Sequence, residues 1–171
     1  MSIKKHFRLS RGFTLVELLV VIAIIGILAT LLLLQLGVAR GRARDVKRIA
    51  DVNQLRTAAE FYFDDNGAKY PTALDLASIG KYLTANAVPV DPVTAVGYFY
   101  AYNTALNPVQ FQIWTELEQK SAAALSADAD INSSAWGGGD TVDASVVGSE
   151  ACTATFAGGA ARDCIYDQGQ K

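Results

Sequence analysis

Hydrophobic and polar positions divide this 171-residue chain into an apolar N-terminal run, an amphipathic middle and a turn-rich remainder. From Leu18 to Leu34, Thr30 is the one polar side chain among seventeen residues. A helix of that length, extended by the apolar residues on either side, can just cross a hydrocarbon core of about 30 Å. The run therefore predicts a membrane-length helix.

The same helix is predicted to continue well beyond the apolar run, because no proline occurs before Pro71. Past Arg44, apolar residues recur at spacings of three and four, which indicates one buried stripe. The stripe consists of Val46, Ile49, Val52, Leu55, Ala59 and Tyr62. Asn66-Gly67 favours a helix end, since glycine readily adopts a left-handed conformation. The pattern predicts one helix over about 13–65, roughly 80 Å long at 1.5 Å per residue.

Shorter elements follow the long helix. A short helix is predicted over 74–83, and the two prolines of 88–92 predict an extended connector. Residues 98–102 and 109–115 are aromatic and β-branched, and they predict an antiparallel hairpin with Trp114 in its core.

The apolar faces of this hairpin are expected to pack on the stripe of the long helix. Residues 121–171 are rich in Ala, Gly, Ser and Asp. We expect them to be mostly loop, with one short strand near 165–166. Together these elements predict an α+β fold, in which a long N-terminal helix packs on a small antiparallel sheet with a loop-rich C-terminal region.

Charged residues mark the start of the apolar run. Residues 1–12 contain four cations and no acid. Glu17 stands at the head of the run, where insertion of a carboxylate costs about 2.5–3.5 kcal/mol, so it needs a partner or a purpose. A secretory signal has its small-residue cleavage site after the apolar region. Here Gly12 precedes that region, so cutting after it would remove the cations, keep the helix and leave Phe13 as the N-terminus.

The basic leader, the Gly12-Phe13 junction, Glu17 and the apolar run together resemble the type IV pilin and pseudopilin family, with its prepilin-type cleavage and methylation motif. The resemblance is specific over residues 11–30 and continues more weakly to Pro71. It implies that prepilin peptidase cuts between Gly12 and Phe13 and methylates the new amine of Phe13. It also implies that Glu17 pairs with the N-terminal amine of a neighbouring subunit during filament assembly.

The resemblance divides the chain into a leader that is removed (1–12), a transmembrane or filament-core half-helix (13–36) and an exported globular domain (37–171). It implies a single-pass membrane protein with its C-terminal domain outside the cytoplasm, and later an extracellular or cell-envelope filament. The implied partners are other copies of the chain in a helical homopolymer, prepilin peptidase and the inner-membrane pilus or secretion machinery. The family usually has a helix-breaking proline where this chain has Leu34.

These features predict a structural subunit of a type IV pilus or pilus-like filament, and no enzymatic activity. A type II secretion pseudopilin and a minor pilin of a DNA-uptake filament are alternatives within the same class. A membrane-anchored binding module, a plain anchor whose Glu17 snorkels and an anchored carboxylate hydrolase are alternatives from other classes. The one histidine is His6, in the leader. The mature chain would therefore have no histidine, which excludes catalytic mechanisms that need a histidine base and the common zinc sites.

Charge is distributed unevenly along the chain. Residues 13–63 have a net charge of +2, and residues 64–171 a net charge of −8. The acidic distal part disfavours nucleic-acid binding. The segment from Gly37 to Arg56 carries six cations: Arg40, Arg42, Arg44, Lys47, Arg48 and Arg56. They predict a solvated collar or partners for acids of neighbouring subunits, with binding of DNA or anionic lipid phosphate as the alternative.

Two cysteines, Cys152 and Cys164, lie near the C-terminus. In an exported domain they are expected to form a disulfide, which would stabilise the fold by roughly 3 kcal/mol. Two buried free thiols in a cytosolic domain are the alternative.

A weak calcium candidate precedes the cysteines. Asp128, Asp130 and Asn132 place oxygen side chains at alternate positions, as a calcium loop does. Ser133 and Gly139 stand where an EF-hand has glycine and glutamate. An acidic surface turn is therefore the alternative, and no other cofactor is expected.

Overall fold

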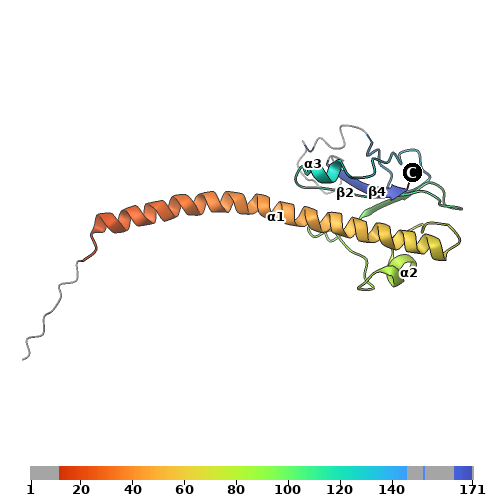
Figure 1. Cartoon of the computed structure of the whole chain (residues 1–171), viewed down its shortest axis with the longest axis horizontal. Coiled ribbons are helices and arrows are strands. Elements are labelled where there is room, and N and C mark those ends of the chain that lie inside the picture. The colour runs from red at the N-terminus through yellow and green to blue at the C-terminus, as the bar shows by residue number, and fades with distance from the viewer. Residues whose placement is uncertain (1–11, 146–151, 153–163, 171) are drawn as a thin grey trace, which may run out of the picture. The chain divides into compact units, whose positions relative to one another are not determined.

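The computed structural model describes residues 12–145, 152 and 164–170, and it contains one long helix and a small sheet (Figure 1). Helix α1 runs over Leu15–Asp65, 51 residues, which confirms the predicted continuous helix. It passes through Gly26 and Leu34 without a break, because an interior glycine costs only about 1 kcal/mol against about 3 for a proline.

Two compact units divide the chain between Ala39 and Arg40, inside α1. The first consists of the apolar half of the helix. The second contains the amphipathic half and all the other elements. The division of the precursor into 1–12, 13–36 and 37–171 stays a prediction.

The C-terminal end of α1 has the geometry that Asn66-Gly67 predicts. Gly67 has a φ of 67°, and Ala68 follows with a φ of 59°. The Ala68 amide donates to the carbonyl oxygen of Phe63 at 3.1 Å. This bond satisfies one of the last helical carbonyls in the manner of a Schellman motif.

The sheet has four antiparallel strands in the order β3-β1-β2-β4. Strands β1 (Phe99–Tyr102) and β2 (Phe111–Glu116) form the predicted hairpin, with Tyr102 opposite Phe111. Strand β4 (Ile165–Gln170) pairs with β2 over six residues, which confirms and lengthens the strand expected near 165–166.

Three short elements complete the second unit. The predicted helix of 74–83 is present as α2 (Leu76–Ile79) and the 3-10 turn η1 (Gly80–Tyr82). It starts later than predicted because Asp75 caps it by accepting the Ser78 amide at 2.7 Å. Strand β3 (Gly138–Gly139) and helix α3 (Ala122–Leu125) were not predicted, since glycine and alanine runs carry no periodic pattern.

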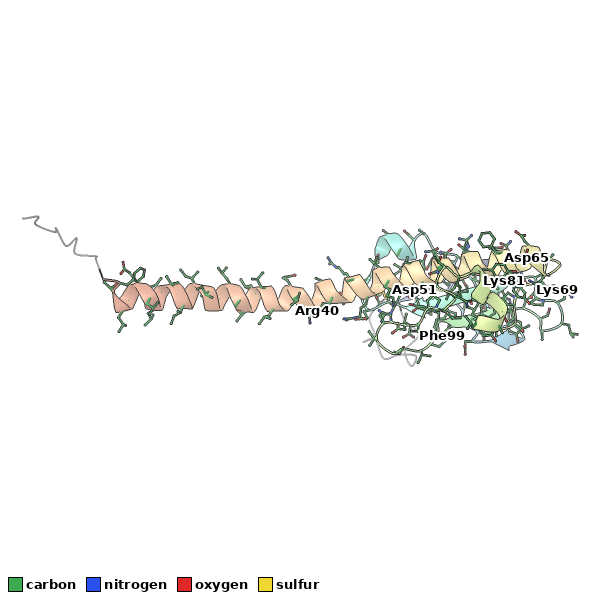
Figure 2. The ribbon with its side chains drawn as sticks, turned by 90° about the horizontal axis from the view of Figure 1, so that it is seen from below. Arg40, Asp51, Asp65, Lys69, Lys81 and Phe99 are labelled. Atoms are coloured by element: carbon green, nitrogen blue, oxygen red, sulfur yellow. A yellow bond between two sulfur atoms is a disulfide. The ribbon has the colours of Figure 1, made fainter. Side chains whose placement is uncertain are left out.

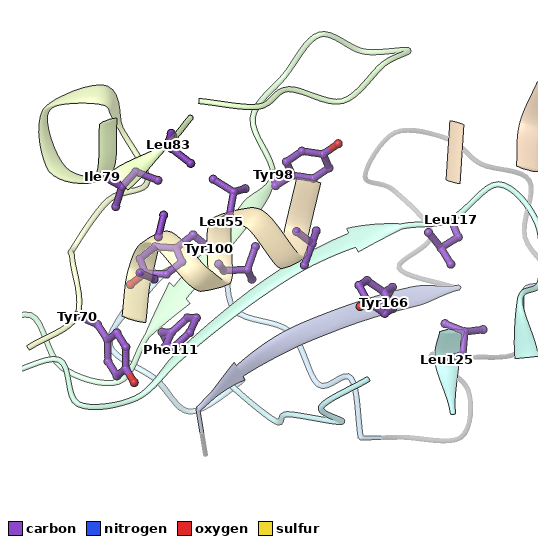
Figure 3. Packing of buried hydrophobic residues seen from close by; sticks show 14 of the residues in the cluster. Leu55, Tyr70, Ile79, Leu83, Tyr98, Tyr100, Phe111, Leu117, Leu125 and Tyr166 are labelled. Carbon is purple, nitrogen blue, oxygen red and sulfur yellow. The ribbon is translucent and has the colours of Figure 1, made fainter. Parts of the chain in front are cut away.

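The main core lies between the amphipathic half of α1 and one face of the sheet (Figure 3). Leu55 of α1 and Phe111 of β2 are both almost fully buried. The other principal members are Val52, Ala58, Ala59, Tyr70, Ile79, Tyr98, Tyr100, Ile113 and Tyr166. The helical stripe is confirmed except at Val46, which is 66% exposed. The buried face at that turn is instead occupied by Asp45 and Arg48.

A second apolar cluster lies on the opposite face of the sheet. Trp114 stacks on Phe99 with ring centroids 4.0 Å apart, and its indole N–H donates to the carbonyl oxygen of Asp140. Val142, Ala144 and Ile165 complete the cluster. Trp114 is therefore a core residue of the hairpin, as predicted.

Candidate functional site

The first turn of α1 contains the residues expected to be processed and to direct assembly. The Oε2 atom of Glu17 accepts the amide of Thr14 at 2.8 Å and its hydroxyl at 2.7 Å. In return, the Glu17 amide donates to the Thr14 hydroxyl at 3.2 Å. This reciprocal pair is a capping box, which satisfies helix N–H groups that have no partner inside the helix.

Thr14 is a residue that the sequence interpretation missed. Thr14-Leu15-Val16-Glu17 has the spacing of a capping box directly before an apolar run, and that signal alone would have identified it. Glu17 was treated as a carboxylate without a local partner. The structure instead gives it a structural role within its own chain.

The predicted cleavage junction has no close neighbours among the described residues. Phe13 is 78% exposed, and a Cβ placed on Gly12 would meet none of their atoms within 4 Å. Both Thr14 donors bond to the Oε2 atom of Glu17. Within the described part of the chain, no donor contacts its Oε1 atom. The roles expected for Gly12, Phe13 and Glu17 stay predictions.

The apolar half of α1 buries none of its large side chains within its own unit. They are 38% to 78% exposed from Leu15 to Val38 wherever the structure gives their exposure. By length and composition α1 could cross a membrane, and the candidate segment is near the N-terminus. Thr30 does not interrupt its apolar surface strongly, because its hydroxyl donates to the Ile27 carbonyl oxygen at 2.8 Å.

The basic segment after this apolar half contains a buried ion cluster. Arg48 is fully buried and donates to Asp91 at 2.5 Å and to both Asp45 and Glu118 at 2.8 Å. Arg44 forms a two-pronged ion pair with the same Glu118. Two of the six cations are thus neutralised inside the domain, where an unpaired charge would be strongly unfavourable.

The carboxylates of this cluster also organise the backbone around them. Asp45 accepts the amides of Glu118 and Gln119, both at 2.9 Å. Asp91 accepts the Arg48 Nε–H through Oδ2 and the amides of Val93 and Thr94, both at 2.8 Å, through Oδ1. The cluster therefore holds the loop after β2 and the 90–97 loop against α1.

The protonation of these carboxylates reflects the cluster. Burial disfavours the ionised form of Asp91, but hydrogen bonds from Arg48 and from the Thr94 and Val93 amides outweigh it and lower its pKa to about 2. The hydrogen bond from Arg44 lowers the pKa of Glu118, with a further contribution from Arg48. Both carboxylates are therefore ionised at neutral pH.

The predicted disulfide is present. Cys152 and Cys164 are bonded, with Cα atoms 4.4 Å apart, and Cys164 is buried beside the main core. The rest of the intervening loop, 153–163, lies outside the described residues. Because Cys164 directly precedes β4, the bond ties Cys152 to the start of that strand.

Of the calcium candidates, Asn132 bonds to other residues through its side chain, and Asp130 does so through its backbone amide. The Asn132 side chain donates to Asp143 at 2.7 Å and accepts the Ser134 amide at 3.0 Å. The backbone amide of Asp130 donates to the buried Asp167 of β4. Among the described residues, no group of three or more His, Cys, Asp or Glu side chains could hold a metal ion. Calcium binding by Asp128, Asp130 and Asn132 stays a prediction.

Comparison with known proteins gives a family match at the N-terminal motif and several similar proteins. Residues 7–33 match the family described as the prokaryotic N-terminal methylation motif. The chain is 40% identical to the type IV wide pilus major component PilA4 of Thermus thermophilus over 93 residues, which cover 54% of this chain and 71% of that protein.

Shorter or less similar matches extend this picture. Identity to the type II secretion system core protein G of Klebsiella michiganensis is 44% over 62 residues, 36% of this chain and 43% of that protein. Identity to a fimbrial protein of Pseudomonas aeruginosa is 32% over 88 residues, 52% of this chain and 48% of that protein. No solved structure gives a significant match.

Proposed function

This chain belongs to the type IV pilin and pseudopilin family, whose members are structural subunits of filaments, and from that premise we propose that it is a subunit of a type IV pilus that polymerises through the apolar half of α1. The observation that carries the proposal is the contrast in burial along this one helix. Its large apolar side chains are exposed up to Val38, whereas Val52 and Leu55 are buried. Exposed apolar surface on that scale requires a membrane or other subunits to cover it.

The same surface serves the chain in two states. In the monomer, the apolar half spans the inner membrane, with the domain outside the cytoplasm. In the filament, the apolar halves of many copies cover one another in the filament core, and the domains lie outside. The partners are then other copies of the chain, prepilin peptidase and an inner-membrane assembly machinery. No catalytic activity is proposed.

Glu17 provides the register between subunits. One of its oxygens is occupied by Thr14, and the other faces no donor of its own chain among the described residues. Removal of residues 1–12 would create an amine at Phe13, a cation suited to that second oxygen on a neighbouring subunit. An unpaired charge in an apolar core is penalised, so only the staggered arrangement that pairs the two groups is favoured.

The processing step is tested by the mass and N-terminal sequence of the mature protein. We expect a chain that starts at a methylated Phe13. Replacing Gly12 by the bulky Trp should leave an uncut precursor that does not assemble, because the exposed junction is then blocked. Normal filaments of the Gly12→Trp variant would contradict cleavage at this position.

The role of Glu17 is tested by separating its charge from its capping bonds. Glu17→Gln keeps a side chain that can complete a capping box but removes the charge, and Glu17→Ala removes both. Thr14→Ala removes the cap and keeps the charge. We expect both Glu17 variants to be cleaved but to give less than about a tenth of the normal filament yield, and Thr14→Ala to assemble. If Glu17→Gln assembles normally, the capping bonds are what matters and the register proposal is wrong.

A pseudopilus subunit of type II secretion is the second candidate, because of the 44% identity to the secretion protein G. The longer match, over 93 residues, is to the pilus component, which favours the pilus. Shearing the cells distinguishes the two. This chain in long filaments of the sheared fraction supports a pilus, whereas retention in the membrane fraction without surface filaments supports a pseudopilus.

A further inference from the structure

The basic segment that follows the apolar half of α1 has cations that the fold does not use. Arg44 and Arg48 are committed to the buried ion cluster, and Arg56 donates to the side chain of Gln168 at 2.9 Å. Arg40, Arg42 and Lys47 are exposed. Within the described ranges, no carboxylate lies within ion-pair distance of these three. Figure 2 shows Arg40 on α1, away from the crowded end with Asp65 and Lys81.

The nearby acids offset these cations only in part. Asp45, Asp91 and Glu118 carry three negative charges, and Arg44 and Arg48 already pair with them and offset two, which leaves the cluster one negative charge. Lys120 adds a fourth exposed cation nearby, since the adjacent Gln119 packs within 3.5 Å of a Cβ placed on Gly41. The surface around this turn of α1 is therefore positive.

The spacing of these cations suits a planar anionic surface that surrounds the helix. Arg40 and Lys47 are seven residues apart and share one side of α1, and Arg42 lies on roughly the opposite side. A nucleic acid that takes the helix into a groove would need the cations on one face of the helix. A membrane presents headgroup phosphates on every side of a helix that passes through it.

The position in the sequence fixes the depth at which the cations would lie. Residues Leu15–Ala39 give a helical segment of about 37 Å, which spans the hydrocarbon core of roughly 30 Å and reaches the headgroups. Arg40 and Arg42 follow at once, and Lys47 comes about one and a half turns later. All three thus fall at or just beyond the level of the phosphates, whichever way the helix is oriented.

We propose that Arg40, Arg42 and Lys47 form a binding surface for anionic phospholipid headgroups, which holds the unassembled subunit at one leaflet of the membrane. The inference rests on the membrane-anchored monomer of the proposed function. Guanidinium groups bind phosphate oxygens with paired N–H donors, and the ammonium of Lys47 adds a point charge. Transfer into a filament requires these lipid contacts to be released, so lipid composition affects the supply of subunits.

The test uses the mature full chain in phosphatidylcholine bilayers with a trace of spin-labelled phosphatidylglycerol or phosphatidylcholine. The motionally restricted fraction of each label gives the relative affinity of the two lipids for the protein. We expect a preference for phosphatidylglycerol of at least about fivefold, the equivalent of roughly 1 kcal/mol, which weakens as salt is raised.

Two matched triple variants give the decisive comparison. Arg40→Gln, Arg42→Gln and Lys47→Gln together should bring the preference to about one. Arg56→Gln, Lys69→Gln and Lys81→Gln remove the same charge from exposed residues farther along the chain and should leave the preference intact. Figure 2 shows Lys69 and Lys81 at the opposite end of the domain from Arg40. Near-UV circular dichroism checks that both variants are folded. Equal loss of preference in both would overturn the inference.

Nucleic acid is the competing partner for the same cations. If the wild-type chain shows no lipid preference but binds duplex DNA in a way that the first triple variant abolishes, the inference is wrong and the surface is a DNA site. If the chain is processed and forms filaments but shows no preference for phosphatidylglycerol, only this inference fails. The proposed function would then stand.

Discussion

The two halves of α1 differ in whether their own unit buries their apolar side chains. In the second unit, Leu55 is 1% exposed because the sheet of the same chain covers it. In the first unit, Leu28 is 55% exposed, and no described residue of that unit buries it. Both residues lie on one continuous α-helix. A segment can thus form a helix without being buried by its own chain, and only the amphipathic half of α1 is buried in that way.

Polar residues follow the same division. In the amphipathic half, Asp51 accepts the Tyr98 hydroxyl at 2.7 Å and Glu60 accepts the Tyr70 hydroxyl at 2.9 Å. These bonds fasten the helix to the domain. In the apolar half, the Glu17 and Thr30 side chains bond, among the described residues, only to residues of their own helical turn. That half therefore leaves its side faces free for contacts outside the chain.

The largest effect is expected at the buried ion cluster. Arg48→Met leaves Asp45, Asp91 and Glu118 without their central cation and should lower the free energy of unfolding by about 3–5 kcal/mol. Arg42→Met, on the exposed side of the same segment, should change it by less than about 0.5 kcal/mol. Chemical unfolding of the mature chain in detergent, followed by tryptophan fluorescence, measures both. Equal effects would mean that the cluster does not hold the domain to α1.

The comparison between the halves is tested directly by Leu55→Ala and Leu28→Ala. Leu55→Ala should destabilise the domain by about 3 kcal/mol, because it leaves a cavity in the core. Leu28→Ala should leave the unfolding of the domain unchanged and reduce the yield of filaments instead. The same unfolding assay and quantification of sheared filaments give the two readouts. A loss of domain stability in Leu28→Ala would contradict the division.

A smaller effect is expected from pH. The pKa of Asp91 is lowered to about 2 from its ordinary value near 4, so its stabilisation is complete above about pH 4 and is lost as the pH falls towards 2. It amounts to about 2 kcal/mol. Asp91→Asn should therefore show a shallower loss of stability between pH 4 and pH 2 than the wild-type chain.

Asp167 gives the opposite control for this pH dependence. Burial raises its pKa, although amides of Ile131 and Asp130 and the Gln112 side chain partly offset that rise. Protonation of Asp167 therefore favours the folded state as the pH falls, and Asp167→Asn should lose stability more steeply with acidification. If the slopes of Asp91→Asn and Asp167→Asn both match that of the wild-type chain, both assignments are wrong.

Much of the fold could be predicted because its signals are local. The apolar run, the absence of proline before Pro71 and the Asn66-Gly67 stop specify α1, and alternation specifies the β1–β2 hairpin. The disulfide followed from having two cysteines in a chain with a membrane-length helix. Val46 was misassigned to the core because periodicity cannot tell an apolar face from a face that receives a buried ion cluster.

The sequence by itself determined that the chain has a long helix, apolar in one half and amphipathic in the other, with a motif at its start that identifies the family. Only the tertiary structure decided which cations are used within the chain. Arg48 and Arg42 lie in the same basic segment and look alike in sequence, yet one is fully buried among three carboxylates and the other is exposed. Those carboxylates come from residues 45, 91 and 118, and only folding brings them to one place.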